Sequence, residues 1–223
     1  FHADSRALAR YLAELAGTAV GHLPMPIRFP PATEPPPRFG PPTLAFLGEP
    51  RFEKGFDLLV EAVAGNRPRN EVAVRLLLQT SGALPAERVS ALRAELPGDV
   101  LLNETVSDEV YWQLMGAADA ILLPYNPVAY ELRSSRILVE AVGCGKPLLV
   151  TAGTWLDEEL GHLGGAGVRV EHTPEGVWDG IRRLVRDYDA LAAAARAAAP
   201  ACRAANSPGA FVAALLAPAE QRR

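Results

Sequence analysis

The sequence has 223 residues and a formal net charge of −4. This length fits one large α/β domain with an appendage better than two complete domains. Hydrophobic residues make up 49% of the chain and charged residues 22%, which allows a sizeable core and excludes a disordered polypeptide. Because the charge balance lacks a basic excess, we do not expect nucleic acid as a partner.

The cysteine content and the hydropathy pattern indicate the cellular compartment of the protein. Cys144 and Cys202 are too few and too far apart for a disulfide framework or a Cys-x-x-Cys metal site. No apolar run reaches the roughly 18 to 20 residues that a membrane-spanning helix needs, and no secretory signal is recognisable. We therefore expect a cytoplasmic protein with no transmembrane segment, or a longer cytoplasmic parent that associates peripherally with a membrane.

The first 42 residues predict a helix followed by a connector. Leucines three or four residues apart indicate a helix from Ala3 to Ala16. Nine prolines between Pro24 and Pro42 favour extended polyproline geometry, so residues 24–42 are expected to form a semi-rigid connector rather than a packed element. Since the chain begins with Phe1 rather than Met, we expect residues 1–23 to be the end of a domain in a longer parent protein.

From Thr43 onward, short apolar runs alternate with helical patterns in six successive units. The expected strands are 43–48, 72–79, 99–104, 119–125, 147–153 and 167–171, and the expected helices are 56–64, 85–96, 107–117, 134–145, 154–161 and 174–197. This alternation predicts an α/β fold, a Rossmann-like doubly wound parallel sheet of about six strands. We place this domain over residues 43–217, with a tail at 218–223, and expect its ligand at the carboxyl ends of the strands.

The first candidate site follows the first of these strands. Gly48 ends the strand, Arg51 and Lys54 follow in the loop, and Gly55 leads into a helix. Two cations beside a helix N-terminus form an anion site, although the same residues could be solvated surface charges. Neither a dinucleotide-binding glycine loop nor a P-loop is present, which argues against a flavodoxin-like or epimerase-like domain.

The second candidate site follows the fourth strand. Ser134 and Ser135 lie where a helix begins, and Glu140 comes about one and a half turns later. Serine hydroxyls and helix-start amides bind phosphate, and a carboxylate accepts hydrogen bonds from two ribose hydroxyls. Together these residues predict a nucleotide pocket; separately, the serines could only cap the helix and Glu140 could only make a structural contact.

With both motifs in place, residues 43–216 resemble the C-terminal donor-binding domain of GT-B glycosyltransferases, especially the retaining family 4 type. Lys54 and Gly55 match the family's diphosphate-binding segment, and Glu140 matches the second glutamate of its Glu-x7-Glu motif. Ala141, Gly145 and Pro147 match the residues that follow that glutamate. The resemblance implies one half of a GT-B architecture, with residues 1–23 ending an N-terminal acceptor domain and residues 24–42 linking the two domains.

The resemblance also implies roles for these residues. Gly48, Arg51, Lys54, Ser134, Ser135 and Glu140 would bind the nucleoside diphosphate part of the donor sugar nucleotide. Arg51 and Lys54 would also be the catalytic residues, because they would neutralise the charge that develops on the leaving diphosphate. Glu140 would orient the donor through its ribose.

Two positions depart from the family pattern. Glu49 takes the place of the family's arginine, so that role passes to Arg51 by proximity. Leu132 takes the place of the first glutamate, which leaves Glu131 and Arg133 as candidates for the sugar-facing position, or Glu131 as a solvated loop charge. We expect neither a metal nor another cofactor. The alternative function is a degenerate, non-catalytic GT-B-like nucleotide-binding or scaffolding module.

Overall fold

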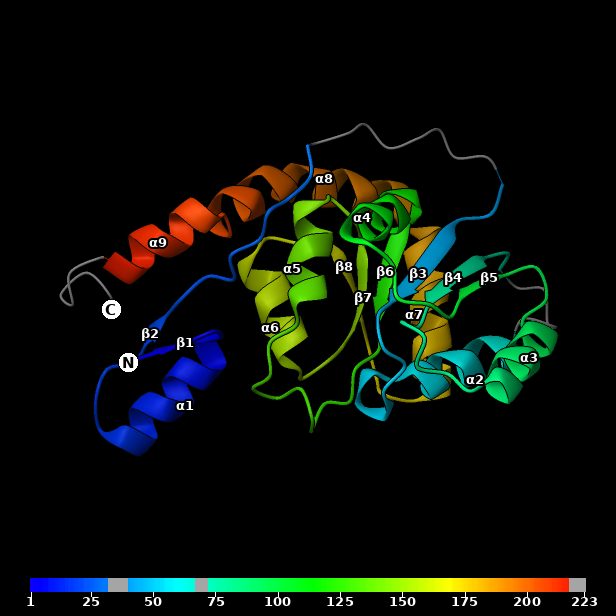
Figure 1. The fold of residues 1–223 in the computed structure, drawn as a ribbon, viewed down its shortest axis with the longest axis horizontal. Coiled ribbons are helices and arrows are strands. Elements are labelled where there is room, and N and C mark those ends of the chain that lie inside the picture. The colour runs from blue at the N-terminus through cyan, green and yellow to red at the C-terminus, as the bar shows by residue number, and fades with distance from the viewer. Residues whose placement is uncertain (32–39, 67–71, 217–223) are drawn as a thin grey trace.

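A computed structural model of the protein describes residues 1–31, 40–66 and 72–216. Six strands, each followed by a helix, form its main domain (Figure 1). The strands are β3 (Thr43–Leu47), β4 (Arg75–Gln79), β5 (Val100–Leu102), β6 (Ala120–Leu123), β7 (Leu148–Thr151) and β8 (Gly167–Val170). The helices that follow them are α2 (Phe56–Asn66), α3 (Ala86–Glu95), α4 (Asp108–Ala117), α5 (Arg136–Gly143), α6 (Trp155–His162) and α7 (Pro174–Arg186).

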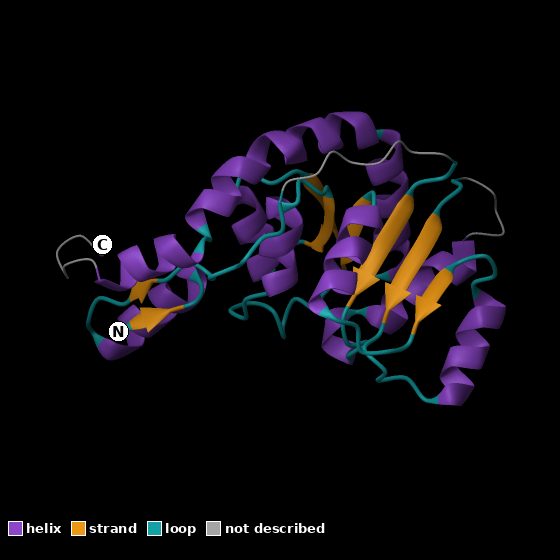
Figure 2. Ribbon diagram, turned by 45° about the horizontal axis from the view of Figure 1, so that its top comes forward, coloured by secondary structure: helices purple, strands orange, loops and turns teal. Residues whose placement is uncertain are grey.

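The strands pair in parallel in the order β5-β4-β3-β6-β7-β8, which confirms the predicted doubly wound sheet. Helices cover both faces of this sheet (Figure 2). In β3, Leu44 and Phe46 pack with α2 and α7, whereas Ala45 and Leu47 pack with α5 and α6. Because both faces are buried, the strands are apolar at nearly every position rather than alternating with polar residues.

The N-terminal segment forms a small unit at one end of the molecule (Figure 1). Strands β1 (His2–Ala3) and β2 (Gly21–His22) pair in parallel on either side of α1 (Arg6–Ala16) in the chain. The predicted helix start at Ala3 is therefore wrong, because residues 2–3 pair with β2 and Ser5 caps the helix by accepting from Leu8 N at 3.0 Å.

The described part of the proline-rich segment packs against the main domain. Ile27 is only 1% exposed, and its N–H donates to Asn206 O at 2.8 Å. A Cβ at Gly143 of α5 would approach the ring of Phe29 to 2.2 Å. The prediction of an unpacked connector is wrong for residues 24–31, because two apolar side chains between the prolines anchor it; residues 32–39 lie outside the described chain.

Two further helices follow α7. The predicted single helix over 174–197 ends instead at Arg186, and α8 (Tyr188–Ala205) begins after Asp187 and packs on α5. Helix α9 (Pro208–Leu216) ends the described chain, so the predicted tail at 218–223 lies outside it. None of the helices in the described ranges is both long and apolar enough to cross a membrane.

Candidate functional site

The order of the strands places the two sequence motifs side by side. From β3 the chain moves outward through β4 to β5, then returns to β6 beside β3 and moves outward in the opposite direction. Parallel sheets bind ligands at this reversal, outside the carboxyl ends of the two central strands. The first motif follows β3 and the second follows β6, so both lie at the reversal point.

Backbone contacts join the two loops. A short 3-10 turn, Phe52–Lys54, follows β3, and the Asn126 N–H from the second loop donates to Glu53 O at 2.9 Å. Gly55 has a φ of 67°, and a Cβ there would come within 2.0 Å of Pro124 O at the end of β6. Only glycine fits this position without displacing the neighbouring strand end. The match of Gly55 to the family motif thus has a packing reason.

Two arginines gather around Glu53. Its carboxylate lies 3.5 Å from Arg51 Nη1 and 3.7 Å from Arg133 Nη1, while Glu49 lies 3.6 Å from Arg51 Nε. The Arg133 guanidinium also stacks 4.8 Å from the ring centre of Tyr130. The structure therefore brings Arg133 from the second motif to the cations of the first.

Lys54 completes this group and lies against the strand end. A Cβ at Gly48 would be 3.3 Å from Lys54 Nζ, so the ammonium lies next to the space that a side chain at position 48 would fill. Partial burial, and then the nearby charge of Arg51, lower the pKa of Lys54 below its usual 10.5. Within the described ranges Lys54 forms no ion pair, which leaves a half-buried cation without a direct counter-charge.

The two serines differ in their surroundings. Ser135 is buried at the N-cap of α5, but its side chain makes no capping hydrogen bond to the helix. The alternative that this serine only caps the helix is therefore wrong. The Ser134 hydroxyl donates to Asp4 Oδ2 at 2.6 Å. An anion at this helix start would therefore meet the carboxylate of Asp4 from the N-terminal segment beside Ser134.

Glu140 lies in the interior, at 3% exposed, although the sequence also allowed a surface position. The Tyr111 hydroxyl donates to Glu140 Oε2 at 2.6 Å, and Arg136 Nε donates to Oε1 at 2.6 Å. Both carboxylate oxygens of Glu140 thus accept a hydrogen bond from another side chain of the protein. The matched residues Gly145 and Pro147 lie elsewhere, in the turn before β7 at the amino-terminal edge of the sheet, where Gly145 has a φ of 66° and packs against α8.

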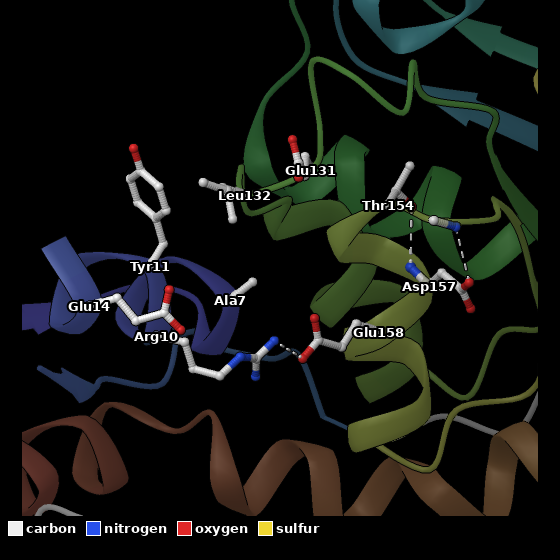
Figure 3. A pocket seen from close by; sticks show the side chains of 10 residues that line it. Ala7, Arg10, Tyr11, Glu14, Glu131, Leu132, Thr154, Asp157 and Glu158 are labelled. Carbon is white, nitrogen blue, oxygen red and sulfur yellow. Dashed lines mark hydrogen bonds and ion pairs between the residues drawn. The ribbon is translucent and has the colours of Figure 1, made fainter.

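The departure at Leu132 lies beside a cavity of about 490 Å³ between α1 and α6 (Figure 3). Glu131 and Leu132 form one side of this cavity, and Figure 3 shows Tyr11 and Glu14 of α1 opposite them. Leu132 O accepts a hydrogen bond from the buried Ser5 hydroxyl at 3.2 Å. Glu131 therefore lies at an open cavity, whereas the backbone carbonyl of Leu132 binds the N-terminal segment.

Sequence analysis missed several residues at this site. Glu53, which pairs with both Arg51 and Arg133, lies inside the first motif and could have been noticed there. Tyr111 and Asp4 come from distant parts of the chain and carry no local signal. No group of three or more His, Cys, Asp or Glu side chains that could hold a metal ion occurs within the described ranges.

Comparisons with known proteins show which family and which structures the chain resembles. Residues 41–187 match the family model described as "Glycosyl transferases group 1", and no curated protein matches the chain. Among solved structures, a glycosyltransferase from Rickettsia africae ESF-5 is similar with a TM-score of 0.75 at 17% identity, covering 96% of this chain and 61% of that protein. Sucrose-phosphate synthase from Thermosynechococcus elongatus gives a TM-score of 0.71 at 16% identity, covering 96% of this chain and 56% of that protein.

A third similar structure is Anabaena HepE in complex with UDP-glucose, with a TM-score of 0.68 at 19% identity. The match covers 94% of this chain and 60% of HepE. The chain therefore spans a little more than half the length of these solved proteins.

Proposed function

The chain belongs to the group 1 glycosyl transferases, and on this premise we propose that its α/β domain binds a nucleoside diphosphate sugar, the donor for transfer to an acceptor hydroxyl. The observation that carries the proposal is the convergence of Arg51, Lys54 and Arg133 where the loops after β3 and β6 meet. A diphosphate at this point would supply the direct ion-pair partner that Lys54 lacks within the described ranges.

In the proposed reaction, the protein's own cations neutralise the leaving group. As the bond between the sugar and the diphosphate breaks, negative charge grows on the diphosphate oxygens. Arg51 and Lys54 would stabilise this charge more strongly in the transition state than in the bound donor, which lowers the barrier. Arg51 would exchange its contacts with Glu49 and Glu53 for the diphosphate, because those ion pairs are partly exposed and weak.

We propose that the acceptor enters through the cavity that Figure 3 shows. Support comes from its position beside the second motif and from its two walls, one on the α/β domain and one on α1. Glu131 lines this cavity, where its carboxylate would meet a sugar that enters there. The N-terminal domain expected in a longer parent protein would supply the remaining acceptor contacts.

Lys54→Ala is expected to weaken binding of UDP or GDP by roughly tenfold to a hundredfold, because a charge-assisted contact contributes about 1.5–3 kcal/mol. Binding of uridine or guanosine should stay within twofold, since neither carries phosphate. Isothermal titration calorimetry measures both. Arg93→Ala, which removes an exposed cation at the end of α3, is the matched control and should change neither affinity. Equal diphosphate affinity in wild type and Lys54→Ala would refute the assignment.

The same lysine predicts a pH dependence. Because the pKa of Lys54 in the free protein lies below 10.5, the ammonium begins to lose its proton at a lower pH than an ordinary lysine. Diphosphate affinity should therefore be constant at neutral pH and fall as pH rises through this lowered pKa. Lys54→Arg should retain affinity to higher pH, since a guanidinium stays protonated. The two pH profiles coinciding would show that Lys54 does not carry the binding charge.

Glu140→Gln tests the ribose assignment. Loss of a charge-assisted hydrogen bond should lower affinity for UDP or GDP by about tenfold or more, and should change affinity for the 2′-deoxy analogues less. Glu131→Gln is the matched control, since its carboxylate lies at the cavity and has no partner within the described ranges, so nucleotide binding should be spared. Equal loss of ribo- and deoxyribonucleotide binding in Glu140→Gln would make Glu140 a structural residue.

A further inference from the structure

The carboxylate of Glu140 has two partners that differ in kind. Arg136 lies one turn earlier on the same helix, and its side chain is 64% exposed. Tyr111 comes from α4, and its ring is partly buried against the core. An exposed arginine can rotate into solvent at little cost, whereas a packed tyrosine cannot.

Aromatic packing fixes the tyrosine in place. The Tyr111 ring lies edge-on to Trp112 at 5.4 Å between ring centres, and Trp112 lies 6.4 Å from Phe29 of the anchored N-terminal connector. Burial, and then the adjacent charge of Glu140, raise the pKa of the Tyr111 hydroxyl. This hydroxyl therefore stays protonated at neutral pH, where it donates to Glu140.

We propose, on the premise of the proposed function, that Tyr111 is a positioning residue for donor recognition. It holds Glu140 Oε2, while Oε1 exchanges Arg136 for a ribose hydroxyl when the nucleotide binds. Tyr111 does not itself touch the nucleotide in this arrangement. It fixes the plane of the carboxylate, so that the free oxygen points in one direction, and the preference for ribose over deoxyribose depends on it.

Tyr111→Phe tests this proposal, because it removes only the hydroxyl. Affinity for UDP and GDP should fall about fivefold to tenfold, and affinity for 2′-deoxy-UDP and 2′-deoxy-GDP should change less than twofold. Tyr188→Phe is the matched control: its hydroxyl donates to Asp119 Oδ1 at 3.2 Å, just before β6 at the opposite edge of the sheet. This control should leave the ribose preference unchanged, and circular dichroism checks that both variants fold.

A double-mutant cycle shows whether Tyr111 acts through Glu140. If it does, Tyr111→Phe combined with Glu140→Gln loses no more ribose preference than Glu140→Gln alone. Independent, additive losses would overturn the proposal, as would equal losses of ribo- and deoxyribonucleotide binding in Tyr111→Phe. Failure of the wild type to bind either nucleotide would instead refute the proposed function, and an unchanged ribose preference in Tyr111→Phe would refute this inference alone.

Discussion

Gly55→Ala is expected to lower the free energy of unfolding by about 2–5 kcal/mol, the sum of a left-handed backbone strain of about 1–2 kcal/mol and an overpacking cost of about 1–3 kcal/mol. The added methyl group would meet Pro124 O at 2.0 Å. That oxygen belongs to the backbone at the end of β6, so it cannot rotate away as a side chain would. Urea unfolding followed by circular dichroism measures the change.

Gly17→Ala separates the two contributions. Gly17 ends α1 with a φ of 63°, close to the 67° of Gly55, but a Cβ there would meet no atom within 4 Å. This control should cost only the backbone strain, about 1–2 kcal/mol. Equal losses in the two variants would show that the loops after β3 and β6 are not in the close contact described.

The functional consequence of Gly55→Ala follows from its neighbours. Lys54 precedes Gly55, and the turn that carries both is held to the second loop through Glu53 O and Asn126 N. Pushing this turn away from β6 would move the ammonium from Gly48 and the arginines from each other. The folded fraction of Gly55→Ala should therefore also bind nucleoside diphosphates more weakly than wild type.

The fold was predictable because local patterns determine it. Apolar runs of four to eight residues alternate with helical patterns along the chain. The simplest fold with this alternation is a doubly wound parallel sheet, and the structure confirms it. The errors arose where distant contacts override a local pattern. Prolines predict an unpacked connector, yet Ile27 and Phe29 are held by α5 and α8, which lie more than a hundred residues later.

The candidate site was predictable in part for the same reason. Gly48, Lys54 and Ser135 lie at strand or helix ends that the pattern locates, and parallel topology brings those ends together. The environment of Glu140 was not predictable, because its partner Tyr111 is on a different helix and their contact depends on how α4 and α5 pack. The hydrogen bond of Ser134 to Asp4 likewise depends on the docking of the N-terminal segment.

The largest expected effect concerns sugar transfer. The 223-residue chain is expected to bind UDP or GDP and yet to transfer sugar about 10⁵-fold or more slowly than the longer parent protein that we propose. The reason is positioning, which lowers reaction barriers by about 7–11 kcal/mol when both reactants are held in place. In the proposed arrangement, the described residues hold the donor, whereas on the acceptor side only α1 faces them across the cavity.

Release of UDP and GDP from UDP-glucose and GDP-mannose, with a panel of mono- and disaccharide acceptors, measures transfer by the two proteins. The parent protein carrying Lys54→Ala is the control: its transfer should be slower if transfer depends on the donor site. Transfer by the parent alone would support a donor domain and exclude the non-catalytic module; nucleotide binding with no transfer by either protein would favour that module. Rapid transfer by the 223-residue chain would mean that α1, held by Ser5 to Leu132 O and by Arg10 to Glu158 at 2.8 Å, already completes the acceptor site.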